Sequence, residues 1–226
     1  MKLLHILAAA TSLLSISAGA APTDAGEVFE AELAAFERED ATEPAAPGGL
    51  LVLGSSSIKF WVSLEEDLAP LKAVNRGFGG SRIADINRNF ARLLGPHRPS
   101  AILLYSGDND LVSASPEAVF SELGRFLDLK TRHLGDVPVY VLTVKPSPAR
   151  VALLPRQRRY NALLAALAER RPDVDMVDIF SSMVGPDQTV RAELFGPDGL
   201  HMNAAGYALW TSLVRTALGL RKELGK

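Results

Sequence analysis

Three serines, one histidine and one aspartate in this chain are spaced in a way that permits nucleophilic catalysis. Ser55, Ser56 and Ser57 directly follow a short apolar run. Asp198 and His201 lie three residues apart near the other end of the chain. A serine hydroxyl is a weak nucleophile until a neighbouring base accepts its proton, and an imidazole base needs a carboxylate to orient it. If the fold brings the two ends together, these residues predict a serine hydrolase mechanism.

Each of these patterns also has an explanation that does not involve a serine nucleophile. A run of serines before a helix commonly caps that helix, and Asp-x-x-His can be half of a metal site or a helix cap. The other histidines beyond the first residues, His97 and His133, lie in a Gly/Pro connector and at an expected helix end. We expect both to be solvated or capping side chains. Since no histidine has His-x-x-x-His spacing, a zinc site lacks ligands.

Two further loops contain groups that can stabilise an oxyanion. Residues 75–81 read Asn-Arg-Gly-Phe-Gly-Gly-Ser, and glycines there allow backbone N–H groups to approach a ligand closely. Neither the dinucleotide-binding fingerprint nor the P-loop spacing with its lysine is present, which disfavours a phosphate site. Asn109, within Gly-Asp-Asn-Asp, offers a side-chain amide. The same four residues also suit a turn or half of a calcium loop.

Apolar runs and helical patterns alternate along the chain. Runs typical of buried strands cover 50–53, 72–75, 101–105, 137–144 and 174–180. Helical patterns cover 27–40, 82–94, 116–129, 153–170 and 204–220. This alternation predicts a single α/β domain in which helices sandwich a parallel sheet of about five strands.

The loops that directly follow the apolar runs contain all the reactive groups named above. In a parallel sheet the carboxyl ends of the strands share one edge, and binding sites form at that edge. The loops are 54–57, 76–81, 107–110, 145–147 and the segment that reaches His201. Their shared position is stronger support for a common site than any single motif.

Composition restricts the partners and the compartment. The formal net charge is −2, which offers no electrostatic support for binding nucleic acid or anionic lipid. We interpret the basic residues Arg150, Arg156, Arg158 and Arg159 as one solvated helix start.

Residues 1–20 have a basic start, an apolar stretch too short to span a membrane and a small-residue cleavage signature. They predict a signal peptide, and residues 21–226 a single exported domain, periplasmic or extracellular, with no membrane span after cleavage. Because the chain has no cysteine, it can form neither a disulfide nor a lipoprotein anchor.

In chain order the four loops resemble the blocks of the SGNH (GDSL-type) hydrolase family. The blocks run from Gly-Ser-Ser-Ser at 54–57 to Asp-Gly-Leu-His at 198–201 and so span most of the chain. The resemblance implies a three-layer α/β/α flavodoxin-like fold and a hydrolase that needs no metal or cofactor. It also implies Ser56 as nucleophile, Asp198 and His201 as its partners, and an oxyanion hole from Ser56, Gly80 and Asn109.

One position departs from the family pattern. The family's Gly-Asp-Ser-Leu reads Gly-Ser-Ser-Ser here, so the usual aspartate is replaced by Ser55. That aspartate is not a triad member, so its absence does not exclude activity. The replacement leaves three adjacent hydroxyls, of which Ser56 keeps the family spacing while Ser55 and Ser57 stay open as alternatives.

The resulting prediction is an esterase that hydrolyses carboxylic esters of small molecules or carbohydrates, with short acyl or acetyl groups. A lysophospholipase or thioesterase of the same family is an alternative. So is a metal-dependent phosphoesterase that uses Asp108, Asp110, Asp198 and His201 as ligands. A glycan-binding module without catalytic activity is the remaining one.

Overall fold

Five parallel strands form one sheet at the centre of the computed structural model, which describes residues 27–43 and 47–220. The predicted signal peptide, 1–20, lies outside the described residues. The strands are β1 (Leu50–Gly54), β2 (Ala73–Gly77), β3 (Ala101–Tyr105), β4 (Val139–Leu142) and β5 (Val174–Val177). Their order across the sheet is β2-β1-β3-β4-β5, the flavodoxin-like order, so the α/β prediction is confirmed. In register, Gly54 of β1 lies between Gly77 of β2 and Tyr105 of β3.

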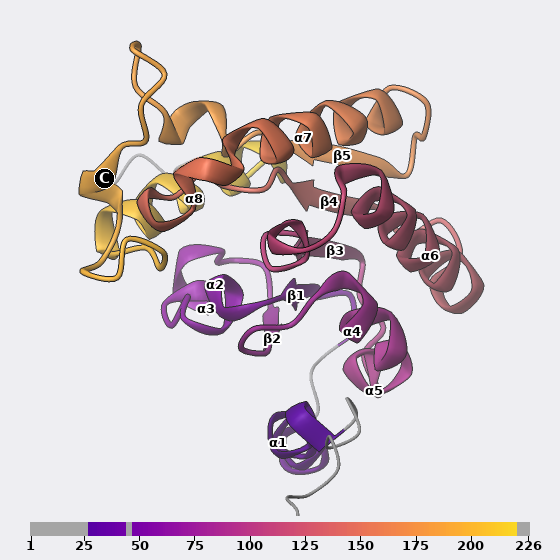
Figure 1. The fold of residues 1–226 in the computed structure, drawn as a ribbon. Coiled ribbons are helices and arrows are strands. Elements are labelled where there is room, and N and C mark those ends of the chain that lie inside the picture. The colour runs from indigo at the N-terminus through magenta and orange to yellow at the C-terminus, as the bar shows by residue number, and fades with distance from the viewer. Residues whose placement is uncertain (1–26, 44–46, 221–226) are drawn as a thin grey trace, which may run out of the picture.

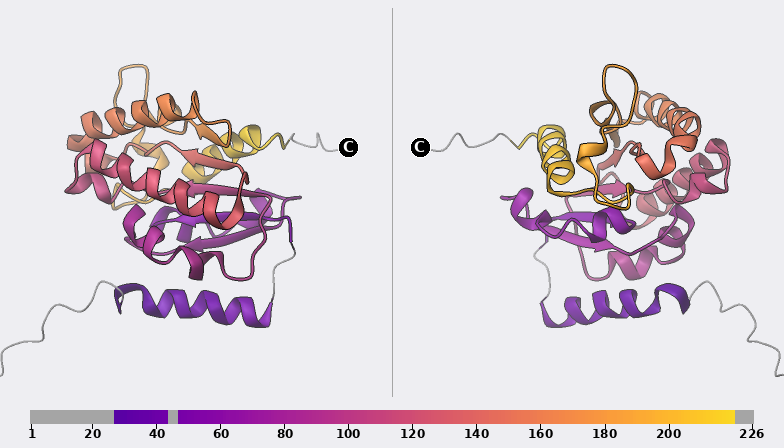
Figure 2. Two further views of the ribbon diagram at one scale, coloured as in Figure 1. Left: turned by 90° about the vertical axis from the view of Figure 1, so that its right-hand side faces the viewer. Right: turned by 60° about the vertical axis from the view of Figure 1, so that its left-hand side comes forward.

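Helices cover both faces of the sheet (Figures 1 and 2). One face is packed by α4 (Ile83–Arg88), α5 (Phe90–Leu94), α6 (Pro116–Leu134) and α7 (Leu154–Ala168). The other is packed by α2 (Ser56–Lys59), α3 (Leu64–Asp67) and α8 (Ala204–Ala217). The separate helix α1 (Glu30–Thr42) lies against α5, outside the first layer (Figure 2). Within the described residues no helix has the length and apolar character needed to cross a membrane.

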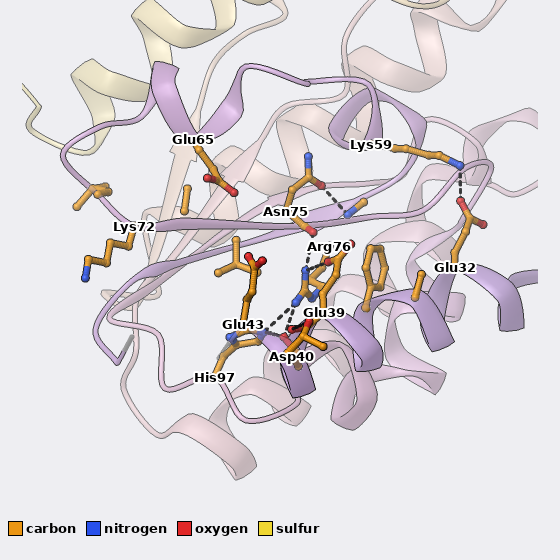
Figure 3. A pocket seen from close by; sticks show the side chains of 17 residues that line it. Glu32, Glu39, Asp40, Glu43, Lys59, Glu65, Lys72, Asn75, Arg76 and His97 are labelled. Carbon is orange, nitrogen blue, oxygen red and sulfur yellow. Dashed lines mark hydrogen bonds and ion pairs between the residues drawn. The ribbon is translucent and has the colours of Figure 1, made fainter. Parts of the chain in front are cut away.

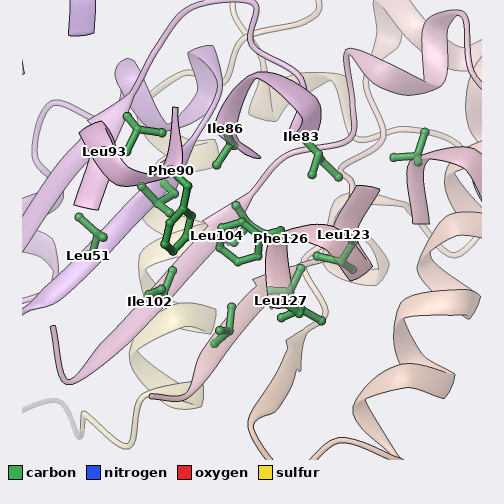
Figure 4. Close-up of a cluster of buried hydrophobic side chains, with 14 of the residues drawn as sticks. Leu51, Ile83, Ile86, Phe90, Leu93, Ile102, Leu104, Leu123, Phe126 and Leu127 are labelled. Atoms are coloured by element: carbon green, nitrogen blue, oxygen red, sulfur yellow. The ribbon is translucent and has the colours of Figure 1, made fainter. Parts of the chain in front are cut away.

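Alternation along the strands divides the buried side chains into two cores. Leu51 and Leu53 of β1 face the α4–α7 layer, where Phe90 and Phe126 stack edge to face with ring centroids 5.6 Å apart (Figure 4). Val52 faces the opposite layer, which is built around Trp210 of α8. Burial on both faces explains why the strands read as continuous apolar runs.

The helices differ from the predicted ranges at identifiable residues. The predicted helix 82–94 is divided into α4 and α5 at Asn89, whose side chain donates to the Asp85 carbonyl oxygen at 3.0 Å. Such a bond competes with the helical ladder and breaks it locally. The α6 helix extends past the predicted end to Leu134, and Gly135 follows in the left-handed region. The one-turn helix α3 had no signal in the sequence.

The prediction that His97 is a solvated or capping side chain is wrong. Its imidazole is buried, with Nε2 3.0 Å from the carboxylate of Asp40 on α1 and 3.3 Å from the guanidinium of Arg76 on β2 (Figure 3). Burial and the nearby guanidinium lower the pKa of His97 against the opposing effect of Asp40. The three side chains attach α1 to the edge strand and line a groove of about 940 Å³.

Close backbone contact between β2 and α2 requires glycine at position 77. A Cβ atom on Gly77 would lie 2.3 Å from the Lys59 nitrogen and 2.8 Å from the Ile58 carbonyl carbon. Backbone atoms cannot move aside as a flexible side chain can. The carboxyl end of β2 therefore depends on the missing side chain.

Replacing Gly77 with alanine should lower the free energy of unfolding by roughly 1–3 kcal/mol, since an added methyl overpacks this contact. Urea denaturation followed by circular dichroism measures the change. Gly124→Ala on α6 is the matched control, because no atom outside its own stretch of helix lies within 4 Å of the added Cβ. It should stabilise by about 0.5–1 kcal/mol through helix propensity. Equal effects of the two substitutions would contradict the close contact.

Candidate active site

The hydroxyl of Ser56 lies at the carboxyl edge of the sheet, at the first residue of α2 and two residues beyond β1. Its Oγ is 3.0 Å from Nε2 of His201, although 145 residues separate the two in the chain. Ser55 and Ser57 are buried, whereas Ser56 is partly exposed. Of the three adjacent serines, Ser56 is thus the one whose hydroxyl meets both the histidine and solvent.

The imidazole of His201 is held by the carboxylate of Asp198. Nδ1 of His201 lies 2.6 Å from Oδ2 of Asp198, and the other carboxylate oxygen accepts the N–H groups of Leu200 and His201 at 2.9 and 3.0 Å. These bonds hold the pKa of Asp198 well below its usual range. An ionised carboxylate only accepts hydrogen bonds, so Nδ1 carries the proton and a neutral ring offers the Nε2 lone pair to Ser56.

The loop that presents this pair is fixed by its own backbone. Gly196 donates to the His201 carbonyl at 2.8 Å, and Gly199 adopts a positive φ of 62° at the tight turn between them. Asn203 then caps α8, since its side chain accepts the Ala205 and Gly206 N–H groups. The position of His201 is therefore set by a closed turn joined to a capped helix.

Helix α8 also contacts the nucleophile's own turn. The hydroxyl of Tyr207 donates to the Ser57 carbonyl at 2.9 Å, which ties the α8 side of the site to α2. Phe60, 46% exposed, stacks edge to face on His201 with ring centroids 4.9 Å apart. The His201 side chain is itself 30% exposed. The site is consequently open to solvent, with one aromatic ring at its margin.

Three groups in the neighbouring loops can donate to an oxyanion. Within the described residues, the backbone N–H groups of Ser56 and Gly80 have no hydrogen-bond partner. Gly80 is exposed and has a positive φ of 76°. The Asn109 amide nitrogen donates to the Ser81 carbonyl at 3.0 Å, which leaves its second N–H free. That bond places Asn109 next to the residue that follows Gly80.

The orientation of the Asn109 amide depends on Arg150, a residue whose role the sequence did not indicate. One guanidinium nitrogen of Arg150 donates to Oδ1 of Asn109 at 2.9 Å, and another lies 2.9 Å from the carboxylate of Asp108. The interpretation of Arg150 as part of a solvated helix start is therefore wrong, since its side chain is only 17% exposed. Long-range contacts of this kind have no local signature in a sequence.

The four side chains that a metal-dependent phosphoesterase would need have separate partners. Asp108 is buried between Lys145 and Arg150, and Asp110 accepts the Ile83 N–H at 3.2 Å. Asp198 is bonded to His201. Among the described residues no group of three or more His, Asp or Glu side chains is arranged to hold a metal ion. The geometry does not favour that alternative.

Comparison with known proteins identifies the class. A model of the GDSL-like lipase/acylhydrolase family matches residues 54–209, and the chain belongs to this family of hydrolases. That match begins at the serine turn and includes Asp198 and His201. A comparison with curated proteins found no match.

Solved structures of low sequence identity share the fold. A Streptococcus pneumonia protein described as a candidate platelet activating factor has a TM-score of 0.76 at 18% identity, covering 85% of this chain and 93% of its own. A GDSL-like lipase from Bacteroides thetaiotaomicron has a TM-score of 0.65 at 18% identity, covering 83% and 98%. The lipase/acylhydrolase from Enterococcus faecalis reaches 0.62 at 20% identity, covering 75% and 95%.

The buried carboxyl group beside Asn109 makes stability depend on pH. Burial raises the pKa of Asp110 to about 6, against the opposing effect of its bond from the Ile83 N–H. Its other oxygen, Oδ2, has no hydrogen-bond partner among the described residues. A folded-state pKa above the unfolded value favours folding at low pH, and this contribution is lost as pH rises through about 6.

Asp110→Asn should therefore be more stable than the wild type above pH 6 and close to it near pH 4, because asparagine keeps the acceptor for Ile83 without a charge. The gain at pH 7.5 is at most roughly 3 kcal/mol, from about two pKa units. Urea denaturation at several pH values measures it, with the exposed Asp128→Asn as control. A difference that does not vary with pH would contradict the raised pKa.

Proposed function

We propose that this protein is an exported serine esterase that hydrolyses carboxylic esters by acyl transfer to water. The observation that carries the proposal is the continuous hydrogen-bond chain from Asp198 through His201 to Ser56. A carboxylate, an imidazole and a hydroxyl in this order are the parts of a nucleophilic triad. Family membership supports the hydrolase class independently of that geometry.

In the proposed mechanism Ser56 Oγ attacks the ester carbonyl carbon while His201 Nε2 takes the hydroxyl proton. The tetrahedral oxyanion accepts hydrogen bonds from the N–H groups of Ser56, Gly80 and Asn109. When it collapses, the bond to the alcohol oxygen breaks and His201 returns the proton to the leaving alcohol. Water then repeats the sequence on the acyl-enzyme, releasing the carboxylic acid and free Ser56.

We propose short acyl or acetyl groups as substrates, with the alcohol part a small molecule or a carbohydrate. Support comes from the openness of the site, where the side chains of Asp198 and His201 are 51% and 30% exposed. An open site can accept a bulky alcohol. A panel of acetyl, butyryl and long-chain esters, an acetylated sugar, a lysophospholipid and a thioester tests this choice. Preference for either of the last two would overturn the proposed substrate while keeping the nucleophile.

Labelling with a fluorophosphonate should modify Ser56, because its hydroxyl alone among the three serines is bonded to the base. Tandem mass spectrometry of the labelled peptide identifies the site. Ser56→Ala should abolish the label and the esterase activity, whereas Ser57→Ala should keep the label. Modification of Ser55 or Ser57 in the wild type would refute the assignment, and a wild type without label would refute the esterase.

Asp198→Asn should lower kcat by a factor on the order of 10⁴, since an amide can donate to Nδ1 and favour the wrong tautomer. Steady-state kinetics against pH measures this loss. Wild-type activity should be lower at acid than at neutral pH, because a general base acts only in its unprotonated form. Asp198, whose pKa is well below its usual range, stays ionised across this span. Activity that is flat from acid to neutral pH would argue against His201 as the base.

Export rests on residues 1–20 alone, which lie outside the described part of the chain. Expression of the full-length protein in a bacterial host should yield a mature form that begins after Ala20 in the exported fraction. N-terminal sequencing of that fraction identifies the first residue. An uncleaved protein retained in the cytoplasm would refute export and leave the esterase proposal unaffected.

A further inference from the structure

A buried charged cluster supports the loop that contains Asn109. Asp108, one residue before it, is 4% exposed and lies 2.9 Å from both the Lys145 ammonium and the Arg150 guanidinium. Lys145 is also buried, and its carbonyl accepts the Gln157 amide at 3.1 Å. The cluster therefore contains one carboxylate and two cations, and Arg150 links it to the proposed oxyanion donor by the hydrogen bond to Asn109.

The Asn109 amide can face in two ways, and its neighbours select one of them. In the observed orientation Nδ2 donates to the Ser81 carbonyl and Oδ1 accepts from Arg150. A half-turn of the amide would place Oδ1 against the Ser81 carbonyl oxygen and Nδ2 against the guanidinium. Both contacts would then join like groups, acceptor to acceptor and donor to donor. The guanidinium thus favours the orientation in which Nδ2 lies beside the Ser81 carbonyl.

The segment that carries Arg150 also contacts the other half of the site. Ala149 donates to the Gly199 carbonyl at 3.0 Å, within the turn between Asp198 and His201. A side chain on Gly199 would meet Pro148, 3.2 Å from its added Cβ. Residues 145–150 therefore join the Asn109 loop to the histidine loop.

We propose that Arg150 is a positioning residue: by its two-pronged contact with Asp108 and Asn109, it holds the asparagine amide with its N–H directed to the oxyanion. This inference rests on the proposed esterase function. Arg150 itself does not touch the reacting atoms in this scheme. The Arg150 side chain affects catalysis only by orienting the Asn109 amide. The inference is therefore testable, because Arg150 should have no effect once Asn109 is removed.

A double-mutant cycle between Arg150 and Asn109 tests whether the effect of Arg150 on kcat requires Asn109. Asn109→Ala should lower kcat by roughly 10²–10³-fold through the loss of one oxyanion donor. Arg150→Met should lower kcat by about 10–10²-fold with little change in KM, since a misplaced donor costs transition-state binding. In the Asn109→Ala background, Arg150→Met should change kcat by less than about twofold, because the group it positions is gone.

Two further variants separate positioning from general stability. Arg150→Lys keeps a positive charge beside Asp108 but cannot bridge both partners, so kcat should stay about tenfold low while the melting temperature approaches that of the wild type. Arg159→Met removes an exposed arginine from α7 whose ion pair within the described residues is with Glu117, and it should leave kcat unchanged. If Arg150→Met does not fold, Arg150→Lys carries the cycle.

A readout that needs no activity distinguishes failure of this inference from failure of the esterase proposal. In protein labelled with ¹⁵N-asparagine, the Asn109 side-chain amide signal is the one lost in Asn109→Ala. It should shift in Arg150→Met and Arg150→Lys but not in Arg159→Met. An unshifted signal, or a kcat loss that persists in the Asn109→Ala background, overturns the positioning role. A shift in the two Arg150 variants, together with a wild type that is inactive on all esters, would uphold the Arg150–Asn109 contact and refute the esterase.

Discussion

All five strands run parallel, and this constraint decides where the reactive groups of the chain can meet. Every strand then ends on the same edge of the sheet, so every loop that follows a strand reaches that edge. β1 and β3 are neighbours although α2, α3, β2, α4 and α5 separate them in sequence. After β1 the chain continues into α2, on one face of the sheet. After β3 it continues into the short helix η2 (Asp110–Val112) and then α6, on the opposite face. Ser56 and Asn109 stand at this division, where an open α/β sheet commonly binds its ligand.

His201 is positioned in a different way, because it does not directly follow a strand. A turn closed by the Gly196 amide and an asparagine cap on α8 hold His201, and Tyr207 joins α8 to the Ser57 carbonyl. Backbone hydrogen bonds tolerate little displacement, so the imidazole is positioned before any substrate is present. Such preorganisation is the main way in which a protein environment lowers a barrier that involves developing charge.

The amino-acid sequence was sufficient for the strands, their order along the chain and the loops at their carboxyl ends. Strands buried on both faces leave a local apolar signature, and a loop after a strand is located by adjacency alone. The sequence was insufficient for His97 and Arg150, both assigned to solvent and both buried or half-buried in contacts with residues more than 20 positions away. It could not separate Ser56 from Ser55 and Ser57 by spacing, because the distinction lies in which hydroxyl the His201 ring meets.

The buried charges of Asp108, Lys145 and Arg150 near Asn109 cost desolvation free energy, and this cost indicates what the cluster does. Removing a carboxylate and two cations from water costs free energy that their attraction does not always recover, so ion pairs of this kind are weak stabilisers. Apolar side chains would pack the same volume at less cost. An apolar neighbour, however, could not distinguish the two ends of an asparagine amide, whereas a guanidinium can donate a hydrogen bond only to the oxygen. The Asp108 carboxylate in turn orients that guanidinium and also pairs with the Lys145 ammonium. The cluster is therefore better understood as a determinant of amide orientation than as a source of stability.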